Sequence, residues 1–139
     1  MIRIARDDDL DFLALHDRHI PRDMMRRKIA DSQVYVAVAE DGTIIGWLRY
    51  GLFWDLVPFI NMLYVLEPYR GKGIGAMLVE RWERDMSERG FDLVLTSTLA
   101  NEHAQGFYRR LGYVDCGALL LPGEPAELIF RKSIGQAGT

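Results

Sequence analysis

A glycine-rich basic turn after an apolar segment is the feature that most constrains this chain. Residues 62–66 are apolar and read as a strand, and residues 74–89 have apolar positions at helical spacing. Between them lies Arg-Gly-Lys-Gly-Ile-Gly at 70–75. Glycines let a backbone approach an anion closely, and amides at the start of a helix point towards it. The first acidic residue of the helix is Glu80, so the turn predicts a phosphate site.

Three kinds of phosphate loop contain such glycines. A nucleoside-triphosphate P-loop is excluded because a glycine, rather than serine or threonine, follows Lys72. A dinucleotide fingerprint fits the glycines and Ala76, but it normally opens a large parallel sheet, and about sixty residues precede it here. A pyrophosphate loop of the form [Arg/Gln]-x-x-Gly-x-[Gly/Ala] fits Arg70, Gly73 and Gly75 at every defined position. We favour the pyrophosphate loop.

Length and composition narrow the class of protein. The chain has 139 residues, of which 49% are hydrophobic and 27% are charged, as expected for one globular domain. A net charge of −3 argues against nucleic acid as a partner. The single Cys116 forms no internal disulfide and offers no zinc spacing, so we expect no metal. The sequence has no long apolar run and no signal-like N-terminus, which predicts a cytoplasmic protein without membrane contact.

Periodicity and turn residues predict alternating strands and helices. We expect strands at 2–5, 34–38, 43–52, 59–66, 91–95, 113–121 and 126–132, and helices at about 7–18, 21–29, 74–89 and 101–111. Asp41-Gly42 predicts a hairpin turn, and Asn101 is a candidate helix cap. A right-handed crossover would make the strand at 91–95 parallel to the strand at 59–66.

A second motif, taken together with this order of elements, indicates a resemblance to a known family. The segment 101–113, Asn-Glu-His-Ala-Gln-Gly-Phe-Tyr-Arg-Arg-Leu-Gly-Tyr, follows the pattern N-x-x-A-x-x-F-Y-x-x-x-G-[FY] at each defined position. Together with the loop at 70–75 it resembles the GNAT superfamily of acetyl-CoA-dependent N-acetyltransferases. The resemblance covers essentially the whole chain.

The resemblance implies an α/β (α+β) fold in a single domain. Residues 1–134 would form the N-acetyltransferase (GNAT) domain, with a central mixed, mostly antiparallel seven-stranded sheet and about four helices in the order β-α-α-β-β-β-α-β-α-β-β. The fourth and fifth strands would splay apart. Residues 135–139 would form a disordered tail.

The resemblance also implies acetyl-CoA as cosubstrate. Backbone groups of the fourth strand would pair with the pantetheine arm and polarise the thioester carbonyl. Amides of the loop would hold the pyrophosphate, while Lys72, Arg109 or Arg110 would meet the ribose phosphate through charge alone. The implied cofactor-binding residues are Leu63, Tyr64, Val65, Arg70, Gly71, Lys72, Gly73, Ile74, Gly75, Ala76, Asn101 and Tyr108.

Tyr108 aligns with the family's usual general acid. A phenol with an ordinary pKa of about 10 can protonate a departing thiolate. The alternative is that Tyr108 only packs on the apolar face of its helix. For Asn101 the capping role and the cofactor contact are compatible with each other.

No general base is assigned. Many relatives carry a glutamate on the fourth strand, but the aligned residue here is Asn61. Glu67 and Asp55 are more simply explained as solvated acids, and a water chain is an alternative. The histidines read as surface or half-buried residues, and Cys116 has no basic partner for a covalent mechanism. These histidines are His16, His19 and His103.

The resulting hypothesis is an enzyme that moves an acetyl group from acetyl-CoA to a primary amine of a small molecule or peptide by direct attack. A CoA-binding sensor with weak catalysis is the alternative, and a dinucleotide-binding domain is a third. Phe53 and Trp54 lie near a predicted turn, where they suit an acceptor pocket or a homodimer face. The sequence does not identify the acceptor.

Overall fold

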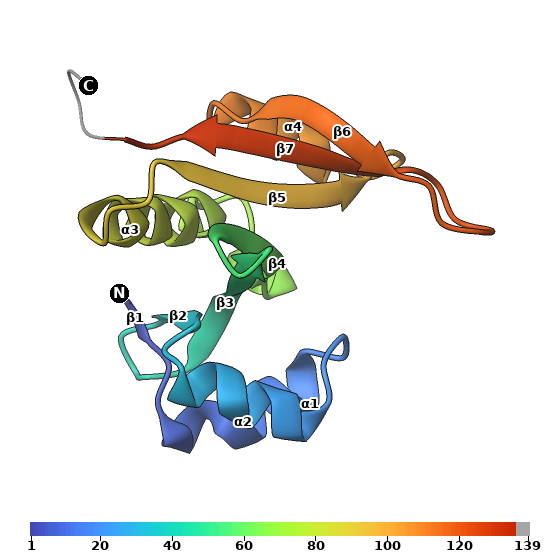
Figure 1. The fold of residues 1–139 in the computed structure, drawn as a ribbon. Helices are drawn as coiled ribbons and strands as arrows, with labels where there is room; N and C mark the ends of the chain where they lie inside the picture. The colour runs from blue at the N-terminus through green and yellow to red at the C-terminus, as the bar shows by residue number, and fades with distance from the viewer. Residues whose placement is uncertain (136–139) are drawn as a thin grey trace. The chain divides into compact units, whose positions relative to one another are not determined.

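The computed structural model describes residues 1–135 and contains the predicted order of elements (Figure 1). The described residues also contain two short 3-10 turns, at Asp7–Asp9 and at Glu67–Tyr69. The helices and strands are β1 (Ile2–Ile4), α1 (Leu10–His16), α2 (Arg22–Ala30), β2 (Val34–Val38), β3 (Ile44–Phe53), β4 (Val57–Val65), α3 (Ile74–Glu88), β5 (Leu93–Leu99), α4 (Ala104–Arg110), β6 (Val114–Leu119) and β7 (Glu127–Ser133). The predicted tail lies almost wholly outside the described residues.

The strands form one seven-stranded sheet in the order β1-β2-β3-β4-β5-β7-β6. The pairs β1–β2, β2–β3, β5–β7 and β6–β7 are antiparallel. β4 and β5 are parallel, with Phe59 opposite Leu95 and Ile60 opposite Thr96. The prediction of a mixed, mostly antiparallel sheet is therefore confirmed, and so is the parallel crossover through α3.

The chain divides into two compact units, which we describe separately. The first unit contains residues 1–50 and 62–82, and the second contains residues 51–61 and the chain from residue 83 onward. Among the described residues, no helix is both long and apolar enough to cross a bilayer.

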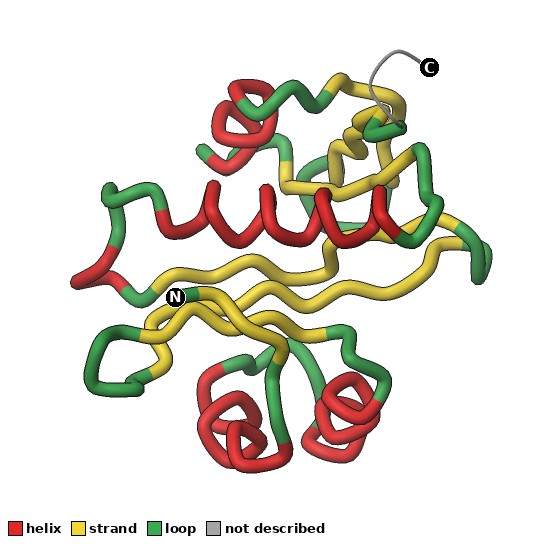
Figure 2. The backbone as a smooth tube through the Cα atoms, turned by 90° about the vertical axis from the view of Figure 1, so that its left-hand side faces the viewer, coloured by secondary structure: helices red, strands yellow, loops and turns green. Residues whose placement is uncertain are grey.

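In the first unit, helices cover both faces of the strands, which explains why all five residues of β2 are buried. Figures 1 and 2 show α1 and α2 together on one face of β1–β3. On the opposite face, the Arg81 guanidinium of α3 lies 5.7 Å from the ring centre of Tyr35, and the Trp82 ring lies 5.7 Å from that of Tyr50. The core on the α1–α2 face consists of Ala5, Leu10, Leu13, Met25, Ile29, Val34, Val36, Val38, Ile44 and Trp47.

In the second unit, aromatic side chains join α4 to the sheet. The ring of Tyr108 lies 5.4 Å from that of Tyr113 and 6.4 Å from that of Phe130, and all three residues are buried. At the edge of the sheet, β6 is exposed along its whole length and carries the exposed thiol of Cys116.

In two places the structure departs from a local prediction for an identifiable reason. The first helix ends at His16 rather than near Arg18, because Asp17 adopts an extended backbone that turns its carboxylate into the interior. Asn101 does not cap α4, whose N-cap residue is His103. The turn before α4 is held instead by the side-chain amide of Gln105, which donates to two backbone carbonyls within it.

Candidate functional site

The turn at residues 70–73 presents a row of backbone amides. Gly71 and Gly73 have φ values of +76° and +82°, which L side chains rarely adopt, and a Cβ at either position would have no neighbour within 4 Å. Within residues 1–135, the amides from Gly71 to Ala76 donate to no backbone carbonyl, since the first helical bond runs from Met77 to Gly73. The first turn of α3 contains no acidic residue. These amides are available to an anion.

The basic side chains of the turn lie over neighbouring aromatic rings. Arg70 donates from Nε to the carbonyl oxygen of Val65 at 2.8 Å, and its guanidinium lies 5.1 Å from the ring centre of Tyr64. The Lys72 ammonium lies 5.8 Å from the ring centre of Tyr69. Arg70 therefore ties the turn to the end of β4, which fixes the start of the turn relative to that strand.

The end of β4 has one edge against β3. A Cβ on Gly46 would lie 3.0 Å from the carbonyl oxygen of Tyr64, so a glycine allows the close approach of the two strands. The Leu66 amide also donates towards β3, to Ile45 at 2.8 Å. Because successive residues of a strand direct their backbone groups to alternate edges, those of Leu63 and Val65 lie on the edge away from β3.

A pocket of about 350 Å³ lies on the α1–α2 side of this region in the first unit. It is formed by the segment that follows α1 together with side chains of β3 and β4. Its lining residues are His16, Asp17, Arg18, His19, Trp47, Met62, Tyr64 and Leu66.

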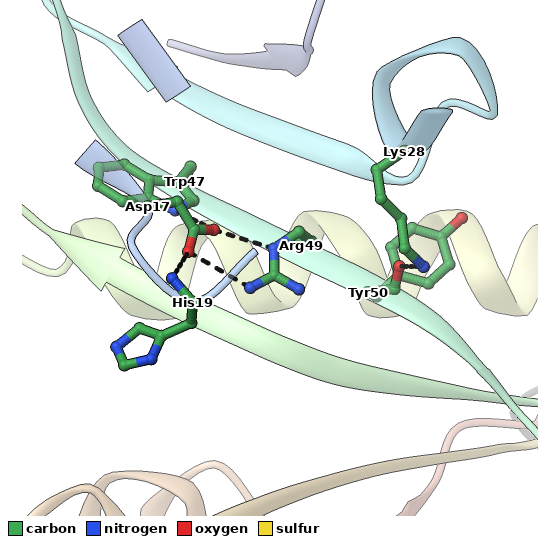
Figure 3. A network of polar contacts seen from close by, with 6 residues as sticks. All are labelled: Asp17, His19, Lys28, Trp47, Arg49 and Tyr50. Carbon is green, nitrogen blue, oxygen red and sulfur yellow. Dashed lines mark hydrogen bonds and ion pairs between the residues drawn. The ribbon is translucent and has the colours of Figure 1, made fainter. Parts of the chain in front are cut away.

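The carboxylate of Asp17 holds one wall of this pocket in place (Figure 3). One of its oxygens accepts from Arg49 Nε at 2.9 Å and from Trp47 Nε1 at 3.3 Å. The other oxygen accepts from Arg49 Nη2 at 3.4 Å and from the His19 amide at 3.2 Å. In Figure 3 the imidazole of His19 points away from this carboxylate.

The sequence alone does not reveal this network, although it contains one signal of it. Arg49 is a charged residue within the run Ile44–Phe53, whose other residues are apolar or glycine, so it predicts a buried partner carboxylate. The partner itself lies 32 residues away, and only the fold identifies it as Asp17. Nearby, Lys28 donates to the carbonyl oxygen of Tyr50 at 3.0 Å. Burial, and then the positive charge of Arg49, lower the pKa of Lys28.

In the second unit, the predicted acid Tyr108 is a buried residue of α4. Burial raises the pKa of Tyr108 to about 12, while a hydrogen bond with the Thr96 side chain acts in the opposite direction. Tyr113 lies beside it and donates to Glu83 at 2.7 Å, and Lys132 donates to the other oxygen of Glu83 at 2.8 Å. Burial, followed by the negative charge of Glu83, raises the pKa of Tyr113 as well.

The remaining candidates are dispersed. The structure brings His16 and His19 together at the pocket, whereas His103 lies in the second unit, at the start of α4. Arg109 is paired with Asp115 at 2.8 Å and lies over the Phe130 ring, so its charge is already partnered. The other polar candidates are exposed and lie in separate segments: Asp55 in the β3–β4 turn, Asn61 on β4, Glu67 in a 3-10 turn and Asn101 before α4.

Comparisons with known proteins agree with this geometry. The model of the acetyltransferase (GNAT) family matches residues 2–113. Streptothricin acetyltransferase from Streptomyces lavendulae is 37% identical over 90 residues, which make up 63% of this chain and 48% of that protein. This chain spans about half the length of the curated relatives it matches.

Solved structures share the fold at low sequence identity. Naa20 from Chaetomium thermophilum, in complex with a bisubstrate analogue, has a TM-score of 0.81 at 21% identity, covering 96% of this chain and 86% of that chain. A NatB acetyltransferase complex bound to CoA has a TM-score of 0.80 at 16% identity, covering 96% and 98%. Because the family model matches residues 2–113, which are most of this chain, the chain belongs to the acetyltransferase (GNAT) family.

Proposed function

We propose that this chain transfers an acetyl group from acetyl-CoA to a primary amine by direct attack. The observation that carries the proposal is the row of amides from Gly71 to Ala76, which donate to no backbone carbonyl within residues 1–135 and lie at a helix start without acidic residues. Membership of the acetyltransferase (GNAT) family supports it, and so does the CoA held by a solved structure of the same fold. The residues proposed to bind acetyl-CoA are those given above for the fourth strand, the loop, Asn101 and Tyr108.

The proposed chemistry needs no covalent enzyme intermediate. The neutral amine attacks the thioester carbonyl carbon, the C–S bond breaks, the amine loses a proton and the thiolate gains one. Backbone groups of Leu63 and Val65, on the edge of β4 away from β3, would pair with the pantetheine arm. The amides of the loop would neutralise part of the diphosphate charge.

Tyr108 is the proposed donor of the proton that the thiolate gains. A phenol with a pKa of about 12 is neutral throughout the working pH range, so it always carries the proton to be donated. The same raised pKa makes donation less favourable than from an ordinary phenol. We assign no base, because the aligned position on β4 is Asn61.

The loop is tested with a matched pair of glycine variants. Gly73→Ala places a methyl group in the turn at φ +82°, and we expect CoA affinity to fall at least about tenfold because the backbone no longer approaches the diphosphate. Gly42→Ala is the control, since Gly42 has a φ of +87°, open space around its Cβ position and a place in the β2–β3 hairpin rather than in the loop. Titration calorimetry with CoA measures both variants.

Activity is measured as thiol release from acetyl-CoA across a panel of amines. Thiol release above the rate without amine supports the transferase. Equal loss of CoA affinity in the two glycine variants would mean that backbone strain, rather than contact with the diphosphate, explains the effect, and the loop assignment would be wrong.

A CoA-binding sensor is the second candidate. The amide side chain of Asn61 at the aligned position favours it, because an amide does not accept a proton usefully. The raised pKa of Tyr108 points in the same direction. Saturable CoA binding without thiol release for any amine would select the sensor over the enzyme.

A further inference from the structure

We propose that the pocket of the first unit receives an uncharged, apolar group carried by the acceptor amine, and that it disfavours acceptors with a second positive charge. The inference rests on the proposed function, and it adds the class of acceptor.

The lining of the pocket is suited to an apolar group. Trp47 and Tyr64 form an aromatic pair with ring centres 5.0 Å apart, and Met62 and Leu66 supply aliphatic surface beside them. A volume of about 350 Å³ lies at the small end of ligand pockets, so the space suits a side group rather than a large molecule. Burial of an aryl or alkyl group here would contribute the hydrophobic part of the binding energy.

The charges of the pocket do not attract a cation. Among the described residues that line it, the one carboxylate belongs to Asp17, whose side chain is 0% exposed. Both oxygens of that carboxylate already accept two hydrogen bonds each, and the guanidinium of Arg49 neutralises its charge. The other ionisable residues in the lining are Arg18, His16, His19 and Tyr64, and none of these is a carboxylate.

Aromatic rings bind cations in some proteins, but Tyr64 already has such a contact. The guanidinium of Arg70 lies 5.1 Å from the ring centre of Tyr64. A second ammonium group entering the pocket would lose its hydration, find no unpaired carboxylate and meet the positive charges of Arg70 and Arg18. Diamines and polyamines are therefore expected to bind poorly.

One wall of the pocket is fixed before any ligand enters. Asp17 joins the segment after α1 to two residues of β3, and its bond to the His19 amide holds the next turn of the chain. A preformed wall costs little ordering entropy on binding, so chemical selectivity at this position is not lost by rearrangement.

The test is direct binding, which does not depend on turnover. The indole N–H signal of Trp47 is assigned by NMR, and the protein is titrated with 2-phenylethylamine and with 1,4-diaminobutane. We expect 2-phenylethylamine to move the Trp47 signal with a dissociation constant on the order of tenfold lower than that of the diamine. Equal affinities, or binding that leaves the Trp47 signal unmoved, would overturn the proposal.

A charge reversal at the rim gives the second arm of the test. Arg18→Glu changes an exposed residue of the pocket, so folding is not at risk, and it should reduce the preference for 2-phenylethylamine severalfold. Arg84→Glu is the control, because it makes the same charge change at an exposed position of α3 outside the pocket. An identical shift in both variants would show that net charge alone sets the preference, and it would contradict the proposal.

These results are separable from the proposed function. If 2-phenylethylamine binds at Trp47 but no amine releases thiol from acetyl-CoA, the pocket assignment stands and the transferase proposal fails. If thiol is released and the two amines bind equally, the transferase stands and the acceptor class is wrong.

Discussion

Asp17 and Arg49 form a buried ion pair that connects the end of α1 to the middle of β3. The distance from Asp17 Oδ2 to Arg49 Nε is 2.9 Å, and the two side chains are 0% and 7% exposed. The pair is isolated from water but fully hydrogen-bonded at the carboxylate, because Trp47 and the His19 amide also donate to it. This contact shapes the wall of the pocket.

Breaking the pair on one side should be costly. Asp17→Asn leaves the Arg49 charge buried without a counter-charge, and we expect a loss of about 3–5 kcal/mol in the free energy of unfolding. The double variant Asp17→Asn/Arg49→Met buries no charge and should recover part of that loss. Urea unfolding of the wild type, both single variants and the double variant measures the coupling. Losses that simply add would contradict a direct interaction.

Gly46→Ala should disturb the end of β4. The new methyl group would lie 3.0 Å from the Tyr64 carbonyl oxygen, so β4 must move away from β3 at an expected cost of about 1–3 kcal/mol. Since Leu63 and Val65 are proposed to bind the pantetheine arm, CoA affinity should fall as well. Thermal unfolding and calorimetry measure the two effects. Gly117→Ala on β6 is the control, because its Cβ position has no neighbour within 4 Å.

Tyr108→Phe should separate catalysis from packing. The ring stays in its buried position and only the hydroxyl is lost, so we expect kcat to fall about 10²-fold or more while the KM for acetyl-CoA changes little. With a pKa of about 12, Tyr108 should cause no loss of activity at alkaline pH below that value. Tyr113→Phe, a neighbouring buried tyrosine that bonds Glu83, provides the comparison. Similar losses of kcat in both variants would indicate a packing role.

Asp9 should contribute stability that is lost in acid. Partial burial opposes ionisation of Asp9, but hydrogen bonds from Arg3 and from the Arg6 amide outweigh it, and the pKa of Asp9 is lowered. A lowered folded pKa means that the contribution is fully present above the unfolded pKa and disappears as pH falls through the folded value. Asp9→Asn should therefore destabilise the protein near neutral pH. The difference from the wild type should vanish at low pH in urea unfolding, and a constant difference would contradict this origin.

Much of the fold follows from local patterns. The helical spacing at 74–89, the apolar run at 34–38 and the Asp41-Gly42 turn each act within a few residues, and the corresponding elements are present. The order of elements and the parallel crossover then follow from general rules of connection. The loop glycines were also identifiable. The turn needs positive φ angles at Gly71 and Gly73, and glycine, the residue that adopts such angles most readily, can be seen directly in the sequence.

Features that depend on distant partners were not predictable. The early end of α1 is set by the contact of Asp17 with Arg49, 32 residues away, which no local pattern contains. The pocket depends on the same contact. Likewise, the capping preference of Asn101 is overridden by Gln105, whose amide bonds the turn from within the helix. Side-chain burial at Tyr108 could be inferred from helical spacing, but the size of its pKa shift depends on the packed surroundings.

The exposed sulfur on β6 has a practical consequence for work with this protein. Cys116 is the single cysteine of the chain, and it stands at the open edge of the sheet. A maleimide dye should therefore attach at one defined place in the second unit without any substitution. The same accessibility means that a colorimetric disulfide reagent will also react with the thiol of Cys116, one equivalent per chain. Cys116→Ser is therefore the appropriate background for continuous assays of thiol release.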